Sequence, residues 1–234
     1  MSANDFDGTA EFIQIPLGKT TLRTYYAAPK DATADTPSVA IAMHVWGVDE
    51  SMREAARRFA SAGFAVAVPD LFARFDPPDG DGATDHAPFV ALARQLTFDI
   101  VDPDFRAAAA WLKAKLPETK TAIAGFCMGG IMALRRSYGY AGTFRAAAVW
   151  YGKVDGTDPA LVEVPLVGSF GAEDTGIPVD SVEAFRAGLR VPNDVAIYPN
   201  ADHAFCDAHR ARYAPAAAAD SWERTIAFLR THLT

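Results

Sequence analysis

The sequence has little cysteine, no excess of basic charge and no long apolar run. Only two cysteines occur in 234 residues, Cys127 and Cys206, which argues against a disulfide framework and predicts a reducing cytoplasm. The formal net charge of −7 argues against a nucleic acid or an anionic membrane surface as a partner. Apolar runs such as residues 65–69 have only strand length. Residues 1–5 carry neither a basic region nor an apolar core, so we expect no signal peptide.

Length and composition predict one globular domain. The chain is long enough for a substantial core, and its 50% hydrophobic and 22% charged residues are ordinary for a water-soluble protein. We therefore predict a single domain over residues 1–234, and no internal repeat divides it. The irregular segment 74–87 contains four aspartates, but their spacing fails the EF-hand pattern. We expect a solvated surface loop there and no metal site.

Alternating apolar and helical patterns predict the fold class. Two short runs at residues 11–15 and 21–26 are typical of an antiparallel hairpin. Further along, apolar runs typical of strands buried on both faces alternate with helical periodicity. We predict an α/β protein with a mostly parallel, doubly wound sheet behind an N-terminal antiparallel hairpin. The predicted strands are 39–43, 64–68, 121–124, 146–150, 164–170 and 195–198, and the predicted helices are 50–62, 103–116, 131–136, 181–188 and 216–232.

One motif between a predicted strand and a predicted helix carries chemical information. Residues 125–130 read Gly-Phe-Cys-Met-Gly-Gly. A Gly-x-nucleophile-x-Gly turn in that place is the nucleophile elbow of α/β-hydrolases, and Cys127 stands where most such enzymes have serine. A thiolate is intrinsically the better nucleophile, but it must be formed and kept. The motif alone leaves open that Cys127 is a small buried apolar residue.

Two downstream residues complete a candidate triad. In α/β-hydrolases the acid and the histidine follow the nucleophile in that order, each in the loop after a strand. Asp174 follows the fifth of the predicted buried strands and His203 follows the sixth. The sequence therefore predicts a Cys-His-Asp triad. Glu173 and Asp202 remain alternatives for the acid.

Several stretches resemble one family of α/β-hydrolases. The chain is similar to the dienelactone hydrolase family (carboxymethylenebutenolidase-like proteins) over nearly everything after residue 38. The resemblance implies a cytosolic, cofactor-free carboxylic ester hydrolase, monomeric, whose partner is a small-molecule ester or lactone. The stretches that carry it are residues 44–48, 69–74, 125–130, 150–152, 170–174, 202–205 and 222–225.

The resemblance also implies a mechanism. Cys127 attacks the carbonyl and forms a thioester acyl-enzyme, His203 pairs with the thiol and then activates water, and Asp174 orients His203. The backbone N–H groups of Val45 and Met128 form the oxyanion hole.

Three further positions bear on the substrate. Arg74 matches an arginine that holds the carboxylate of the family's anionic lactone. His44 stands where members that cleave dienelactone have a glutamate, so we expect it to tune the thiol; the alternative is a hydrogen bond to backbone near the oxyanion loop. Asp207 stands where a second arginine is expected, which makes an anionic dienelactone a doubtful substrate. Arg210 and Arg212 are alternative cations from the same loop.

The remaining predictions concern aromatic residues and the second cysteine. We expect aromatic side chains near the strand ends to wall a compact apolar pocket, with some of them in the core. Cys206 lies three residues after His203, and a regulatory disulfide with Cys127 is a hypothesis. The alternative function is a non-catalytic ligand-binding or thiol-sensing member of the same fold, in which His44 holds a resting thiolate. The aromatic residues are Trp46, Phe72, Phe75, Trp150 and Tyr151.

Overall fold

The computed structural model describes residues 6–140 and 142–234. The chain divides into two compact units, one ending at Thr121 and the other beginning at Ala122. The prediction of a single domain over residues 1–234 stays a prediction. Within the described ranges, no helix is both long and apolar enough to cross a membrane.

The first unit contains the predicted hairpin. Strands β1 (Gly8–Leu17) and β2 (Thr20–Pro29) pair antiparallel along their whole length. They are longer than predicted because the turn needs only two residues, with Gly18 at a φ of 60° that favours glycine. β2 also pairs antiparallel with β4 (Ala65–Pro69), which runs parallel to β3 (Ser38–Ala42). The order in this unit is β1-β2-β4-β3.

Helices cover both faces of these strands. Helix α3 (Phe98–Lys115) covers the face that presents Ala65 and Ala67, where its Leu112 joins the same buried cluster. Helix α1 (Glu50–Ser61) also packs against β2 and β4. Alternate residues of β4 point to opposite faces, and all of them are fully buried in the range from Ala65 to Val68. The continuous apolar run of this strand is therefore explained by burial on both sides, as predicted.

In this unit one predicted helix start was wrong and one helix was not predicted. The predicted helix start at Pro103 is five residues too late, because α3 begins at Phe98. Val101 and Phe105, one turn apart, are both buried, so the apolar face extends before the proline, which removes only one helical hydrogen bond. The predicted irregular surface loop is confirmed from Asp76 to His86, where the chain is irregular and mostly exposed, but it is bordered by a 3₁₀ turn, η2 (Ala73–Phe75), and by a helix that was not predicted, α2 (Ala87–Ala93).

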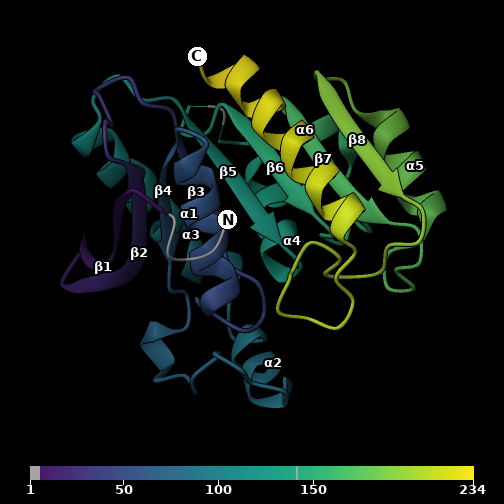
Figure 1. Ribbon diagram of the computed structural model, residues 1–234, viewed down its shortest axis with the longest axis horizontal. Helices are drawn as coiled ribbons and strands as arrows, with labels where there is room; N and C mark the ends of the chain where they lie inside the picture. The colour runs from purple at the N-terminus through teal and green to yellow at the C-terminus, as the bar shows by residue number, and fades with distance from the viewer. Residues whose placement is uncertain (1–5, 141) are drawn as a thin grey trace. The chain divides into compact units, whose positions relative to one another are not determined.

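Over the residues that the structure describes, the second unit contains parallel strands and three α-helices. Each strand pairs with the next in chain order, so the order is β5-β6-β7-β8. Helix α6, yellow in Figure 1, crosses β6, β7 and β8, while α4 packs against β6 and α5 against β8. The elements are β5 (Thr121–Phe126), α4 (Met128–Arg136), β6 (Ala146–Trp150), the 3₁₀ turn η3 (Pro159–Leu161), β7 (Leu166–Gly171), α5 (Val179–Gly188), β8 (Asn193–Tyr198) and α6 (Pro215–Leu233).

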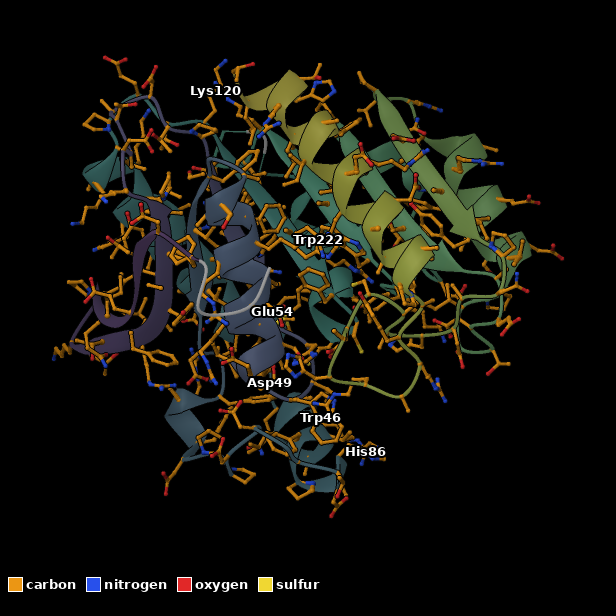
Figure 2. The ribbon with its side chains drawn as sticks, viewed as in Figure 1. Trp46, Asp49, Glu54, His86, Lys120 and Trp222 are labelled. Atoms are coloured by element: carbon orange, nitrogen blue, oxygen red, sulfur yellow. The ribbon has the colours of Figure 1, made fainter. Side chains whose placement is uncertain are left out.

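An aromatic stack fills the core of the second unit. The rings of Trp150 and Phe126 stack with centroids 4.5 Å apart. The ring of Trp222 on α6, which Figure 2 labels, has its centroid 5.0 Å from that of Trp150. The Trp150 indole N–H donates a hydrogen bond of 3.3 Å to Ser221 Oγ, so its polar atom is satisfied. Trp150 is fully buried and is one of the predicted aromatics that belong to the core.

Candidate active site

The nucleophile elbow lies between β5 and α4. Cys127 has φ 55° and ψ −117°, a strained conformation for a residue with a side chain. A Cβ atom on Gly125 would lie 2.0 Å from the carbonyl oxygen of Gly129, and one on Gly130 would lie 2.7 Å from Cα of Gly152. Because backbone approaches so closely at both positions, only glycine fits there. The tight turn holds the Cys127 side chain at the start of α4.

His203 and Asp174 come together from neighbouring loops. Asp174 follows β7 and His203 follows β8, and the parallel pairing of these strands brings both loops to the same edge. The Nδ1 atom of His203 lies 2.6 Å from Oδ2 of Asp174, whose side chain is only 4% exposed. The other carboxylate oxygen accepts a hydrogen bond of 2.9 Å from the Gly176 N–H. The carboxylate is therefore fixed by the backbone while it orients the imidazole.

The neighbouring acids have other roles. Asp202 Oδ1 accepts a 2.6 Å hydrogen bond from the backbone N–H of His203 and pairs with Arg212 at 3.2 Å. Glu173 is exposed. Among the three acids considered from the sequence, it is Asp174 that contacts the imidazole ring.

Cys127 and His203 interact directly. Burial lowers the pKa of His203, but hydrogen bonds to Asp174 and Cys127, together with the charges of both, outweigh burial and raise that pKa from 6.5 to about 10. His203 is therefore an imidazolium at neutral pH. An imidazolium next to a thiol stabilises the thiolate, which is the reactive form of cysteine.

Tyr151 lies beside this pair. It follows β6 directly, has a φ of 38° and is buried. Its ring centroid lies 5.1 Å from that of His203, and its hydroxyl oxygen lies 3.0 Å from Cys206 Sγ. The pKa of the Tyr151 hydroxyl is raised well above 10, mainly by burial. The hydrogen bond to Cys206 and the negative charges nearby raise it further. The hydroxyl is therefore neutral and able to donate a hydrogen bond.

Met128 is the first residue of α4. Its N–H has no acceptor within the helix, because the first turn of any helix leaves its N–H groups without intrahelical partners. The amides of Gly130 and Ile131 bond back to the Cys127 carbonyl, at 3.0 and 3.3 Å. The start of α4 thus presents a polarised N–H next to Cys127. Val45, the other predicted oxyanion residue, is half-buried in the first unit, and its role stays a prediction.

His44 is held by a residue that sequence reasoning missed. Its Nε2 lies 2.8 Å from Oδ1 of Asp49, and both side chains are buried. The same Asp49 oxygen accepts a 3.2 Å hydrogen bond from the Met52 N–H and so caps helix α1. An aspartate directly before the predicted helix at Glu50 was the available signal. The thiol-tuning role of His44 stays a prediction.

Arg74 also has a partner that was not predicted. Its guanidinium forms an ion pair with Asp104 of α3, whose side chain is fully buried, and it donates a hydrogen bond of 3.3 Å to the Ile100 carbonyl. The signal was a charged residue, Asp104, beside Phe105 on the apolar face of a predicted helix. In this structure the cation stabilises a buried carboxylate. Its role in holding a substrate carboxylate stays a prediction.

Asp207 is buried and paired. Its Oδ1 accepts a 2.9 Å hydrogen bond from the His209 N–H, and its Oδ2 lies 3.6 Å from Nε of Arg210. Arg210 is thus engaged by Asp207 and Arg212 by Asp202, so both alternative cations of this loop neutralise carboxylates.

Two predicted pocket aromatics line a cavity in the first unit. Trp46 and Phe72, with Phe89 of α2, border a cavity of about 410 Å³. The Trp46 ring lies 5.3 Å from that of Phe89 and 6.3 Å from that of His86, which Figure 2 shows beside it. The cavity is not the compact apolar pocket that was predicted, because charged residues also line it, namely Arg23, Arg53, Asp70, Asp79 and Asp81.

Mostly parallel strands with helices on both faces, and a nucleophile elbow with a histidine and an acid in the later loops, define an α/β-hydrolase. A sequence model described as the dienelactone hydrolase family matches residues 22–233, and the chain belongs to that family. The fold class and the resemblance predicted from the sequence are confirmed.

Individual relatives agree with this assignment. A protein named "Putative carboxymethylenebutenolidase" from Escherichia coli K12 is 30% identical over 95% of this chain and 87% of its own length. A protein of the same name from Salmonella typhimurium is 31% identical over 93% and 86%. The crystal structure titled "Putative Dienelactone Hydrolase" from Klebsiella pneumoniae superposes with a TM-score of 0.86 at 29% identity, covering 96% and 99%. The chain is a carboxylic ester hydrolase of small esters or lactones, and the comparisons do not favour the non-catalytic alternative.

Proposed function

We propose that this protein hydrolyses a small ester or lactone through a Cys127–His203–Asp174 triad and a thioester intermediate. The observation that carries the proposal is the chain of contacts from a strained elbow cysteine, through an imidazole, to a buried carboxylate. These contacts support the proposal because nucleophilic catalysis needs a nucleophile, a base beside it and a group that orients the base.

The first step is acylation of the sulfur. The Cys127 thiolate attacks the substrate carbonyl, a C–S bond forms, and negative charge moves to the carbonyl oxygen. The Met128 N–H at the start of α4 stabilises that oxyanion. When the carbonyl reforms, the C–O bond to the alcohol breaks and the His203 imidazolium gives its proton to the leaving oxygen. In a lactone the alcohol stays attached to the acyl group.

The second step releases the acid. His203, now neutral, takes a proton from water, and the resulting hydroxide attacks the thioester carbonyl. The C–S bond breaks, and the thiolate and imidazolium are restored together. Asp174 accepts the Nδ1–H hydrogen bond throughout, which fixes the ring orientation and stabilises the imidazolium. Tyr151, which follows β6, packs against the His203 ring and limits its movement.

The decisive test replaces the sulfur. We expect Cys127→Ala to lower kcat/KM for a small activated ester on the order of 10⁴-fold, because loss of the nucleophile removes the covalent route. In wild-type protein, acid quenching during turnover should trap an acyl group on the peptide that contains Cys127, and mass spectrometry should find none on the peptide that contains Cys206. Full turnover in Cys127→Ala would refute the proposal.

A further inference from the structure

The second cysteine lies in the same group of side chains as the proposed nucleophile. Cys206 Sγ lies 3.0 Å from the Tyr151 hydroxyl oxygen. Cys127 lies against the same segment, because its backbone N–H donates a hydrogen bond of 3.1 Å to the carbonyl of Trp150, the residue before Tyr151. Cys206 is brought there by the turn after His203, in which Ala204 has a φ of 61° and its carbonyl accepts a 3.0 Å hydrogen bond from the Asp207 N–H.

Neither cysteine is in a disulfide, and both are partly exposed to solvent. A thiolate held by an imidazolium reacts readily with hydroperoxides, and exposure allows them to reach it. Oxidation beyond the sulfenic acid, to the sulfinic or sulfonic acid, is irreversible for an ordinary cysteine, whereas a nearby thiol can capture the sulfenic acid before that happens. A hydrolase that depends on Cys127 would therefore be vulnerable unless a second sulfur intercepted the first oxidation product.

We propose that Cys206 is that second sulfur: it captures the sulfenic acid of Cys127 as a reversible Cys127–Cys206 disulfide that protects the nucleophile. The inference rests on the proposed function, because it takes Cys127 as the reactive thiolate. It assigns to Cys206 a modification role outside the hydrolytic steps. Tyr151 contributes by holding Cys206 Sγ through its hydroxyl.

The chemistry balances with a hydroperoxide as the oxidant. The Cys127 thiolate attacks the distal peroxide oxygen, the O–O bond breaks, and the S–O bond of a sulfenic acid forms as the alkoxide or hydroxide leaves and takes a proton. The Cys206 sulfur then attacks the sulfenic sulfur. An S–S bond forms, the S–O bond breaks, and the Cys206 proton leaves with the oxygen as water. An added dithiol returns both thiols and is itself oxidised.

The test treats the protein with hydrogen peroxide and follows mass and activity together. In wild type we expect a species about 2 Da lighter, a peptide that links Cys127 to Cys206, and recovery of most activity with dithiothreitol. The matched variant is Cys206→Ser, which keeps a hydroxyl for Tyr151. We expect it to lose the cross-link and to retain roughly tenfold less activity than wild type after oxidation and reduction, with Cys127 as the sulfinic acid. Each activity is expressed relative to the same variant before oxidation.

Two results would overturn the inference. One is wild-type protein in which peroxide produces the sulfinic acid of Cys127 without a cross-link, and the other is equal recovery of wild type and Cys206→Ser. Cys206→Ala is a second variant, which removes both the sulfur and the hydrogen bond to Tyr151. If both variants lose the cross-link and the recovery, the loss is due to the missing sulfur and not to the serine. Failure of the proposed function looks different, since Cys127→Ala would then still turn over the ester. A protein whose turnover needs Cys127 but which forms no cross-link refutes only the disulfide.

Discussion

Among the described residues, each unit has a histidine–carboxylate pair, and the two pairs contact different groups. His203 contacts Asp174 through Nδ1 at 2.6 Å, and its ring also bonds to Cys127. His44 contacts Asp49 through Nε2 at 2.8 Å, and that carboxylate also caps helix α1. The local contact is nearly the same in both pairs. What differs is the group that each pair serves, a thiol in one and a helix terminus in the other.

Exposure separates the pairs further. The His203 side chain is 30% exposed, whereas that of His44 is 8% exposed. A group that exchanges protons with substrate and water must be reachable, and a group that stabilises a helix start need not be. The comparison therefore teaches that the contact between a histidine and a buried carboxylate is nearly the same in both units, so the proposed active site is distinguished by the accessible thiol beside it.

The largest expected effect on activity comes from breaking the contact between His203 and Asp174 in the second unit. We expect Asp174→Asn to lower kcat/KM by roughly 10³- to 10⁴-fold, as loss of the acid does in serine-protease triads, because the imidazole loses its orientation and the imidazolium its counter-charge. The matched control is Glu173→Gln, an exposed neighbour that should behave like wild type. Equal losses in both variants, measured by steady-state ester hydrolysis, would contradict the assignment of the acid.

The pH dependence of stability tests the same pair. The pKa of His203 is raised to about 10 in the folded protein, against 6.5 as the ordinary value. The contacts of its imidazolium therefore stabilise the fold fully below about pH 6.5, and this contribution is lost as the pH rises toward about 10.

Urea unfolding should thus give a difference between wild type and Asp174→Asn that is largest at about pH 6 and shrinks by about pH 10. Taking the difference cancels the titration of groups that the substitution does not touch. A difference that stays constant across this range would mean that His203 is not held as an imidazolium.

The next effect concerns the cation of the first unit. We expect Arg74→Met to lower the free energy of unfolding by about 3 kcal/mol, because it leaves the fully buried Asp104 carboxylate without its counter-charge. Lys30→Met is the control, since Lys30 and Asp7 form an ion pair with both side chains more than 70% exposed, worth less than about 1 kcal/mol. Unchanged stability with a raised KM for an anionic lactone would instead assign Arg74 to substrate.

The smallest effect is expected at the first-unit pair. Asp49→Ala removes the cap of α1 and should lower the free energy of unfolding by about 1 kcal/mol, while Asp49→Asn, which still caps, should lose less. Hydrolysis by both variants should stay within about threefold of wild type if the pair is structural. A loss of kcat as large as that of Asp174→Asn would show that His44 tunes the thiol. Both histidine–carboxylate pairs would then serve catalysis.

Local patterns in the sequence determined much of the fold. Apolar runs of strand length predicted the buried strands because residues on both faces of a covered sheet must be apolar. The elbow was predictable because close backbone approach at Gly125 and Gly130 admits only glycine. The order Cys127, Asp174, His203 was predictable because parallel strands deliver their following loops to one edge. Each of these signals depends on a few consecutive residues.

Other features depended on contacts between distant segments, which no local pattern encodes. Which of Glu173, Asp174 and Asp202 meets the imidazole is set by how the loop after β7 lies against the loop after β8. The start of α3 was misplaced because tertiary burial of Val101 outweighs the helix-breaking tendency of Pro103.

The sequence alone thus determined the class of fold, and it predicted the candidate nucleophile and the chain order of its proposed partners. Tertiary structure decided which carboxylate pairs with which basic side chain: Asp174 pairs with His203, Asp49 with His44 and Asp104 with Arg74. The physical reason is that a buried charge or polar group must be paired, and the nearest partner in space lies up to tens of residues away in the chain. Periodicity places residues on elements, whereas packing of the elements chooses their partners.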